Sequence, residues 1–262
     1  MMFSTTSAFI IITLVATATA LKDAGVYIIG GQPSSVEEYP SIVQVERRDG
    51  GKWHFICGAV IISKRTVVST ANQISKKVKP CNLRIRAGSS KYEKGGHIVR
   101  VRNYQIHPDF VRKNGTSNIV LLTLRTRLPM SNVIQPAFIV PSGLEVPDNH
   151  EVQEAGWGET RFSNHSEVLQ QAIVYTINHD ECSRRFVAAA AGYQALPENM
   201  ICAGILDGGE RYTCNRDSGG PLYMDGMLVG LVTSARKNCT DLSLTRYTKV
   251  SAFTDWIKSN AD

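Results

Sequence analysis

In this chain of 262 residues, the apolar residues occur in many short runs, and residues typical of turns separate one run from the next. Runs of this length and spacing predict antiparallel β-strands rather than alternating strands and helices. Examples of these runs are residues 41–45, 59–62, 67–69, 119–124 and 228–232. The end of the chain differs, because Ser251 is placed to cap a helix over residues 252–259 whose apolar side chains share one face. The pattern therefore predicts an all-β protein with a C-terminal helix.

The start of the chain is typical of a secreted protein. Residues 8–16 form an apolar run, and the small-x-small triplet 18–20 follows it, so residues 1–20 are interpreted as a cleaved signal peptide. No later stretch is long and apolar enough to span a membrane, which predicts a soluble extracellular protein. The full chain of 262 residues has 43% hydrophobic residues, which is enough for one compact unit or two closely packed lobes.

The net charge of +6 allows a surface that attracts acidic partners, although a basic face is often only a solvated face. One stretch holds nine cations and a single acid, Glu93. No aromatic interleaving accompanies the charge, so a nucleic-acid function is not predicted. No pair of histidines has zinc-site spacing, and neither a metal nor a cofactor is expected. The cations are Lys76, Lys77, Lys79, Arg84, Arg86, Lys91, Lys94, Arg100 and Arg102.

The segment from Cys214 to Leu222 contains Asp217-Ser218-Gly-Gly-Pro and resembles the nucleophile loop of the trypsin and chymotrypsin family, C-x-G-D-S-G-G-P. Supporting matches occur at residues 28–31, 155–158, 199–204 and 247–257. The resemblance covers residues 28–262 and implies two packed six-stranded antiparallel β-barrels, an active-site cleft between them and a C-terminal helix. It also divides the chain into a signal peptide (1–20), a propeptide (21–27) and a protease-homologue domain (28–262).

The family's catalytic triad is incomplete in this chain. Asn72 stands where the family carries its histidine and Asn118 where it carries its aspartate, while Ser218 is retained. The mechanism requires a base that takes the serine proton and a carboxylate that orients this base. An asparagine amide does neither at neutral pH, and none of the six histidines aligns with the lost position. The resemblance therefore predicts a protein that is not an enzyme, with no functional catalytic residue.

Four further positions depart from the family pattern around the substrate pocket. Tyr212 replaces the aspartate that gives a trypsin its specificity, and Ala235 and Thr245 replace glycines that keep the pocket open. Arg216 replaces the glycine whose backbone N–H belongs to the oxyanion hole. We expect these side chains to fill the pocket.

The resemblance also implies a maturation step. Cleavage after Tyr27 would free the Ile28 amine, which in the family forms an ion pair with the carboxylate at the position of Asp217. Retention of this pair is expected to organise the loop whether or not catalysis follows. Asn-x-Ser/Thr sequences mark three possible glycosylation sites, at Asn114, Asn164 and Asn238.

Six cysteines in a secreted chain predict disulfide bonds. The resemblance implies that Cys182 pairs with Cys202 and that Cys214 pairs with Cys239. The usual partner of Cys57 is missing, because Gln73 occupies its position. A relocated bridge from Cys57 to Cys81 is therefore expected.

Loss of both partners of the serine, with Tyr27 before an Ile-Ile-Gly-Gly start, is similar to the scabies mite inactivated serine protease paralogues, relatives of the group 3 mite allergens. This resemblance implies a binding protein that engages host plasma proteins and inhibits complement. The alternative is a residual serine hydrolase of unusual mechanism that uses Ser218. The basic stretch between Lys76 and Arg102 is the first candidate for the binding surface.

Overall fold

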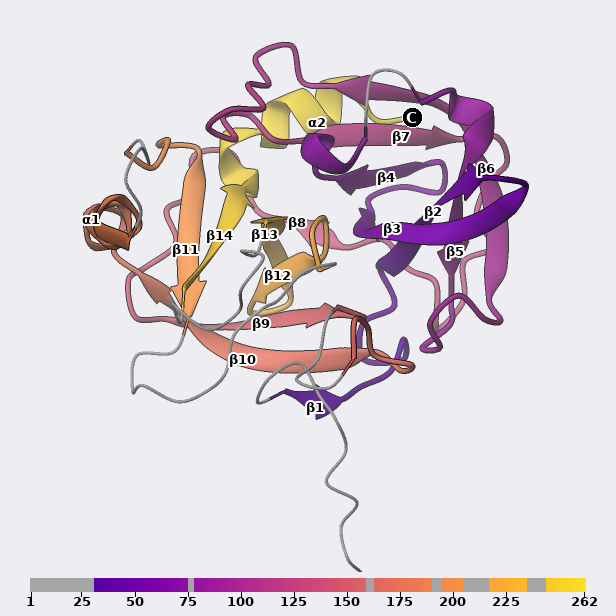
Figure 1. The fold of residues 1–262 in the computed structure, drawn as a ribbon, viewed down its shortest axis with the longest axis horizontal. Coiled ribbons are helices and arrows are strands. Elements are labelled where there is room, and N and C mark those ends of the chain that lie inside the picture. The colour runs from indigo at the N-terminus through magenta and orange to yellow at the C-terminus, as the bar shows by residue number, and fades with distance from the viewer. Residues whose placement is uncertain (1–30, 75–77, 159–162, 190–194, 205–216, 235–243) are drawn as a thin grey trace, which may run out of the picture.

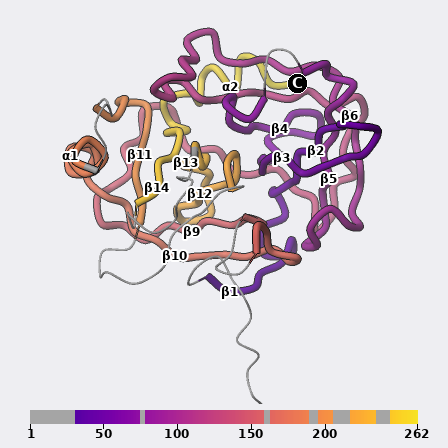
Figure 2. Tube along the Cα trace, in the orientation of Figure 1, coloured from indigo at the N-terminus to yellow at the C-terminus, as the bar shows by residue number. Residues whose placement is uncertain are grey.

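The computed structural model describes residues 31–74, 78–158, 163–189, 195–204, 217–234 and 244–262. The predicted signal peptide and propeptide lie outside these residues, and their boundaries stay predictions. Two β-barrels lie side by side, as Figure 1 shows, with the N-terminal barrel on the right and the C-terminal barrel on the left and below. The Cα trace in Figure 2 shows α2 lying along the top of the molecule and α1 at the side far from the first barrel.

The first barrel closes from six antiparallel strands in the order β2-β3-β4-β7-β6-β5. Alternate side chains of these strands point inward, so that Val45, Ile85 and Val99 are almost completely buried in its core. The outward positions are mostly polar. Its strands are β2 (Ile42–Asp49), β3 (Lys52–Ile61), β4 (Thr66–Ser69), β5 (Leu83–Ala87), β6 (His97–Ile106) and β7 (Val120–Leu124).

The second barrel also closes from six antiparallel strands, because β9 pairs with both β10 and β12. Two short strands extend its sheet: β1 (Gln32–Pro33) pairs with β10, and β8 (Phe138–Ile139) runs parallel to β13. The predicted architecture of two six-stranded antiparallel barrels is thus confirmed. The six strands of the second barrel are β9 (Glu151–Gly156), β10 (Gln170–Ile177), β11 (Met200–Gly204), β12 (Pro221–Met224), β13 (Met227–Ser234) and β14 (Leu244–Lys249).

The C-terminal helix forms, but it starts later than Ser251. A 3₁₀ turn, η3 (Val250–Ala252), precedes α2 (Thr254–Asn260), and no side chain caps α2. Ser251 is buried, and its hydroxyl makes no hydrogen bond with any residue in the described ranges. The Thr254 hydroxyl donates instead to the Val140 carbonyl at 2.8 Å, which ties the helix start to the second barrel. Tertiary packing has therefore displaced the local capping signal. Two further 3₁₀ turns are η1 (Ala71–Gln73) and η2 (Pro80–Asn82).

A second helix, α1 (His179–Ala189), was not expected from the apolar pattern. Asn178 caps it, because its Oδ1 accepts hydrogen bonds from the backbone N–H groups of Asp180 and Glu181 at 3.1 and 3.2 Å. The spacing of Asn178 and Glu181 is close to that of a capping box, and this was the signal in the sequence that identifies the helix.

Candidate functional site

The loop that carries Ser218 is fixed between the two barrels. The Ser218 carbonyl accepts a hydrogen bond from Gly58 of β3 at 2.9 Å, and the Gly219 N–H donates to Val232 of β13 at 2.7 Å. Gly219 has a φ of +81°, and a Cβ there would lie 2.2 Å from the hydroxyl of Ser69. Only glycine fits this position, so the Ser-Gly-Gly sequence follows from the close contact of the loop with the first barrel.

Asp217 is buried, with only 3% of its surface exposed. Its Oδ1 accepts a hydrogen bond from the Gly158 N–H at 2.8 Å. A Cβ on either Gly156 or Gly158 would come within 2.1 Å of a carboxylate oxygen of Asp217. These glycines therefore make the space for the carboxylate, which explains the Gly-Trp-Gly sequence. Ile28 lies outside the described residues, so its pairing with Asp217 stays a prediction.

The two asparagines at the triad positions lie together. The Asn72 N–H donates to Asn118 Oδ1 at 2.8 Å, and Asn72 Nδ2 donates to the Thr233 carbonyl of β13 at 2.7 Å. Asn118 is buried, and its carbonyl accepts from the Thr248 hydroxyl of β14 at 2.9 Å. The Asn72 side-chain amide and the Asn118 backbone carbonyl thus connect the first barrel to the second, while the Asn118 side chain holds Asn72 within the first barrel.

Asn72 Oδ1 is buried and accepts no hydrogen bond from the residues that the structure describes. Within the described part of the chain, no hydrogen bond joins Asn72 to Ser218. Ser218 itself is 6% exposed. A carboxamide oxygen accepts hydrogen bonds but is not a base at neutral pH, so Asn72 is not the group that would deprotonate Ser218.

His107 serves the packing of the C-terminal helix. Its ring lies 5.1 Å from the ring of Phe253 and 4.9 Å from that of Trp256, measured between centroids. Its Nδ1 accepts a hydrogen bond from the Asp109 N–H at 3.2 Å, which requires an unprotonated nitrogen. Burial lowers the pKa of His107, and the nearby Asp109 carboxylate opposes this shift.

Most of the predicted pocket-filling residues lie outside the described residues, namely Tyr212, Arg216 and Ala235. Thr245 is described: it is buried on β14 opposite Ala203 of β11. The predicted filling of the pocket therefore remains an expectation.

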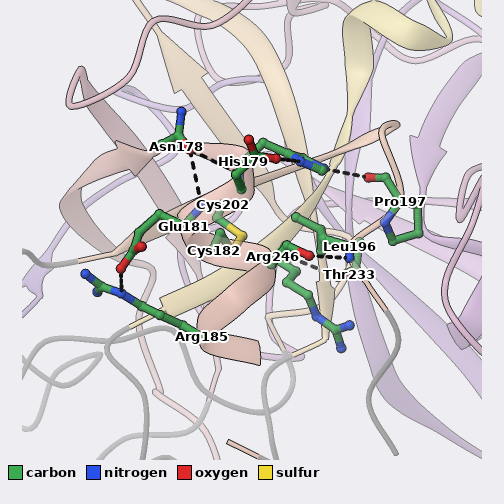
Figure 3. The surroundings of a disulfide bond; sticks show 12 residues. Asn178, His179, Glu181, Cys182, Arg185, Leu196, Pro197, Cys202, Thr233 and Arg246 are labelled. Atoms are coloured by element: carbon green, nitrogen blue, oxygen red, sulfur yellow. Dashed lines mark hydrogen bonds and ion pairs between the residues drawn. A yellow bond between two sulfur atoms is a disulfide. The ribbon is translucent and has the colours of Figure 1, made fainter. Parts of the chain in front are cut away.

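The cysteine predictions have different outcomes. The predicted bridge between Cys182 and Cys202 is confirmed, and Figure 3 shows it joining α1 to β11. Cys214 and Cys239 lie outside the described residues. The predicted bridge between Cys57 and Cys81 is wrong, because both are free thiols.

The reason lies in the direction of the two side chains. Cys57 points into the core of the first barrel, where its sulfur lies 3.6 Å from the Ser69 hydroxyl, whereas Cys81 is exposed in η2. The positions of the two cysteines in the sequence did not show that one side chain faces the core and the other faces solvent. Burial raises the pKa of the Cys57 thiol to about 12, and the contact with Ser69 offsets part of the shift.

The possible glycosylation sites differ in access. Asn164 is exposed, while Asn114 is half-buried and its Oδ1 accepts from the Thr116 N–H at 3.1 Å. Asn238 lies outside the described residues.

The basic stretch does not form one face. Arg84 and Arg86 both bind the buried carboxylate of Glu46, at 2.5 and 2.6 Å. Lys94 pairs with Glu167 at 3.1 Å on the side of the second barrel. Lys76 and Lys77 lie outside the described residues, and Arg100 and Arg102 lie on β6. Barrel closure thus separates members of the stretch: Lys94 lies toward the second barrel, whereas Arg84 and Arg100 lie opposite each other on the first.

The fold and the loop around Ser218 agree with the comparisons with known proteins. The family model described as Trypsin matches residues 28–257. This chain belongs to the trypsin family. It is 33% identical to "Trypsin, alkaline A" of Manduca sexta over 240 residues, covering 89% of this chain and 91% of the relative. It is 34% identical to "Trypsin" of Phaedon cochleariae over 238 residues, covering 90% of this chain and 88% of the relative.

A solved structure has the same fold. The scabies mite inactivated protease paralogue S-D1 superposes with a TM-score of 0.78 at 22% identity, covering 88% of this chain and 96% of the other. At this identity the likeness shows the fold. No helix within the described ranges has the length and apolar character to cross a membrane.

The prediction that this chain is not an enzyme is contradicted by these comparisons, because relatives that cover most of it are named trypsins. Two substitutions in a triad do not by themselves establish that hydrolysis is lost. A protease that lacks triad members still accelerates hydrolysis by roughly 10³–10⁴ over water, through its oxyanion hole and substrate binding. The retained Ser218 loop has the backbone contacts described above.

Proposed function

We propose that this trypsin-family protein is secreted and acts by binding a partner protein through its exterior, with complement components of host plasma as the partner class. The observation that supports a binding role is the use of asparagine at both positions: the Asn118 side chain accepts from the Asn72 N–H, and the Asn72 side chain donates to Thr233 of the second barrel. The partner class comes from the sequence resemblance to the mite paralogues. The trypsin-like fold shared with a protein described as an inactivated protease paralogue is consistent with it.

The β10 patch is our candidate for the surface that binds the partner. It consists of Ile173 and Tyr175 on β10, which are 46% and 37% exposed, and of their exposed β9 neighbours Gln153 and Glu151. Residues two apart on a strand point to the same side, so the two apolar side chains form one surface. Aromatic and apolar anchors surrounded by polar groups are typical of protein interfaces.

The β10 patch replaces the basic stretch as the candidate. On β5, the single negative charge of Glu46 balances one of the two positive charges of Arg84 and Arg86. Charged side chains also more often increase association rates than anchor a complex. Ile173 and Tyr175, by contrast, expose apolar surface, and its burial against a partner stabilises the complex.

The test is a haemolysis assay in host plasma. The variant Ile173→Ser/Tyr175→Ser should weaken inhibition at least about tenfold, because truncated anchor residues commonly cost this much affinity. The control Phe138→Ser/Val187→Ser removes exposed apolar side chains elsewhere, which are 79% and 45% exposed, and should leave inhibition unchanged. Equal inhibition by both variants would contradict the β10 patch.

Ser218→Ala separates this function from proteolysis. If the protein acts as a binding protein, Ser218→Ala inhibits complement as well as the wild type does. Loss of inhibition in a folded Ser218→Ala variant would show that the exterior is not responsible.

The second candidate is a serine hydrolase that uses Ser218. It is favoured by the backbone hydrogen bonds that hold Ser218 and Gly219 and by the trypsins among the relatives. A fluorophosphonate probe tests it, because labelling of Ser218 requires an activated oxygen. Labelling that is absent in Ser218→Ala supports the hydrolase. Equal, background labelling of both proteins rejects it.

A further inference from the structure

The outer surface of the first barrel carries a cluster of arginines around one tryptophan. Arg84 of β5 lies directly opposite Arg100 of β6, and Arg48 of β2 lies opposite Trp53 of β3. Arg102 follows Arg100 by two residues and is exposed like it, on the same strand. We call these five residues the arginine face. Figure 1 shows β2, β3, β5 and β6 on the side of the molecule far from α1.

Trp53 holds two of the guanidinium groups in place. The Arg84 guanidinium lies 4.4 Å from the centroid of the Trp53 ring, and that of Arg100 lies 5.2 Å from it. Arg100 also donates from Nη1 to the Cys81 carbonyl at 3.2 Å. Stacking on an aromatic ring and a backbone contact restrict these long side chains before any ligand binds, which lowers the entropy lost on binding.

The charge of the arginine face is only partly balanced. Glu46 is its one carboxylate neighbour among the ion pairs of the described residues, and it is shared between Arg84 and the buried Arg86. Arg48, Arg100 and Arg102 are exposed and make no ion pair within the described ranges. The surface therefore presents several cations to solvent, and Trp53 orders two of them, Arg84 and Arg100.

We propose that the arginine face binds a sulfated polysaccharide. Guanidinium groups form planar, two-pronged hydrogen bonds with oxyanions, which a sulfate group offers. Residues directly opposite on neighbouring antiparallel strands, such as Arg84 and Arg100, typically have Cβ atoms about 5 Å apart. Arg102 extends this pair along β6 at a bulge of that strand, so the face matches a ligand whose anionic groups repeat along a chain.

A folded protein fits this surface less well. The centres of protein interfaces are depleted of charge and rely on buried apolar or aromatic anchors. Four of the five residues here are arginines, and Trp53 is already half-covered by two of them. The arginine face lies on the first barrel and the β10 patch on the second, so this inference does not depend on the proposed function.

Binding of the full mature protein to immobilised heparin, measured over a series of NaCl concentrations, tests the proposal. Arg100→Gln/Arg102→Gln should weaken binding at least about tenfold and reduce the slope of log Kd against log[NaCl] by about 1.5. The variant loses two contacts with anionic groups, so its binding releases fewer counterions from the polysaccharide. The control Arg184→Gln/Arg185→Gln removes the same net charge from α1, where both arginines pair with Glu181. It should bind heparin as the wild type does.

Trp53→Leu removes the stacking surface without changing the charge. We expect it to weaken binding several-fold and to leave the salt slope unchanged, because the arginines remain but are less ordered. Thermal unfolding of each variant verifies that the fold is retained.

Three results would overturn the proposal: no binding of the wild type to heparin, equal weakening by both arginine double variants, or competition by polyglutamate as strong as that by heparin. The second would show that net charge alone attracts the polysaccharide. The third would indicate an acidic protein as the partner.

Discussion

Substitution of Glu46 by glutamine should strongly destabilise the first barrel. The Glu46 side chain is 1% exposed, and its two oxygens bind Arg84 Nε at 2.5 Å and Arg86 Nε at 2.6 Å. Arg86 is only 7% exposed and also donates to the Gly95 carbonyl, which fixes the loop between β5 and β6. The carboxylate therefore compensates buried positive charge and positions a loop at the same time.

The magnitude follows from the burial. Removing one partner of a buried ion pair leaves an uncompensated charge and typically costs 3 to 5 kcal/mol, so Glu46→Gln should lower the free energy of unfolding by about that amount. For a chain of this size, each kcal/mol lowers the melting temperature by about 2 to 4 °C. The expected decrease is about 6 to 20 °C.

Urea unfolding followed by tryptophan fluorescence measures this change, with the disulfides kept intact. The matched control is Glu167→Gln, which breaks the ion pair with Lys94 between side chains that are 66% and 70% exposed. The control should unfold at the urea concentration of the wild type, because solvent screens such pairs. If Glu46→Gln lost less than about 1 kcal/mol, the buried carboxylate would not hold the barrel as we infer.

Three further outcomes are expected. The contribution of His107 to stability should be constant above pH 6.5 and should be lost as the pH falls toward the lowered pKa of His107, because burial among aromatic rings opposes protonation of the imidazole. Thermal melts of His107→Gln should lack this part of the pH dependence. Iodoacetamide should label Cys81 in the folded protein and Cys57 only after unfolding, as mass spectrometry of peptides would show; labelling of neither thiol under both conditions would instead indicate a bridge. Gly158→Ala should cost more than about 3 kcal/mol in urea unfolding, because its Cβ would lie 2.1 Å from a carboxylate oxygen of Asp217; a stable variant would show that this carboxylate has room to move.

The loop around Ser218 shows how far a motif carries an argument. The Asp-Ser-Gly-Gly-Pro sequence identified the family, which the comparisons confirm. The asparagines at positions 72 and 118 were equally visible in the sequence, yet the residue types alone did not decide whether the protein is active. Rate depends on the positions of all groups around the substrate, and the relatives named as trypsins contradict the prediction that this chain is not an enzyme.

The sequence by itself determined the β class and the family, because strand patterns and motifs are local properties of the chain, and the family resemblance then implied the Cys182–Cys202 bridge. Tertiary structure alone decided that Cys57 faces the barrel core while Cys81 faces solvent, and that the helix α2 starts at Thr254. It also divided the basic stretch, so that Arg84 and Arg86 bind Glu46, Arg84 and Arg100 lie over the Trp53 ring, and Lys94 pairs with Glu167. Which side chains meet depends on strand register and barrel closure, and these arise from contacts between residues far apart in sequence.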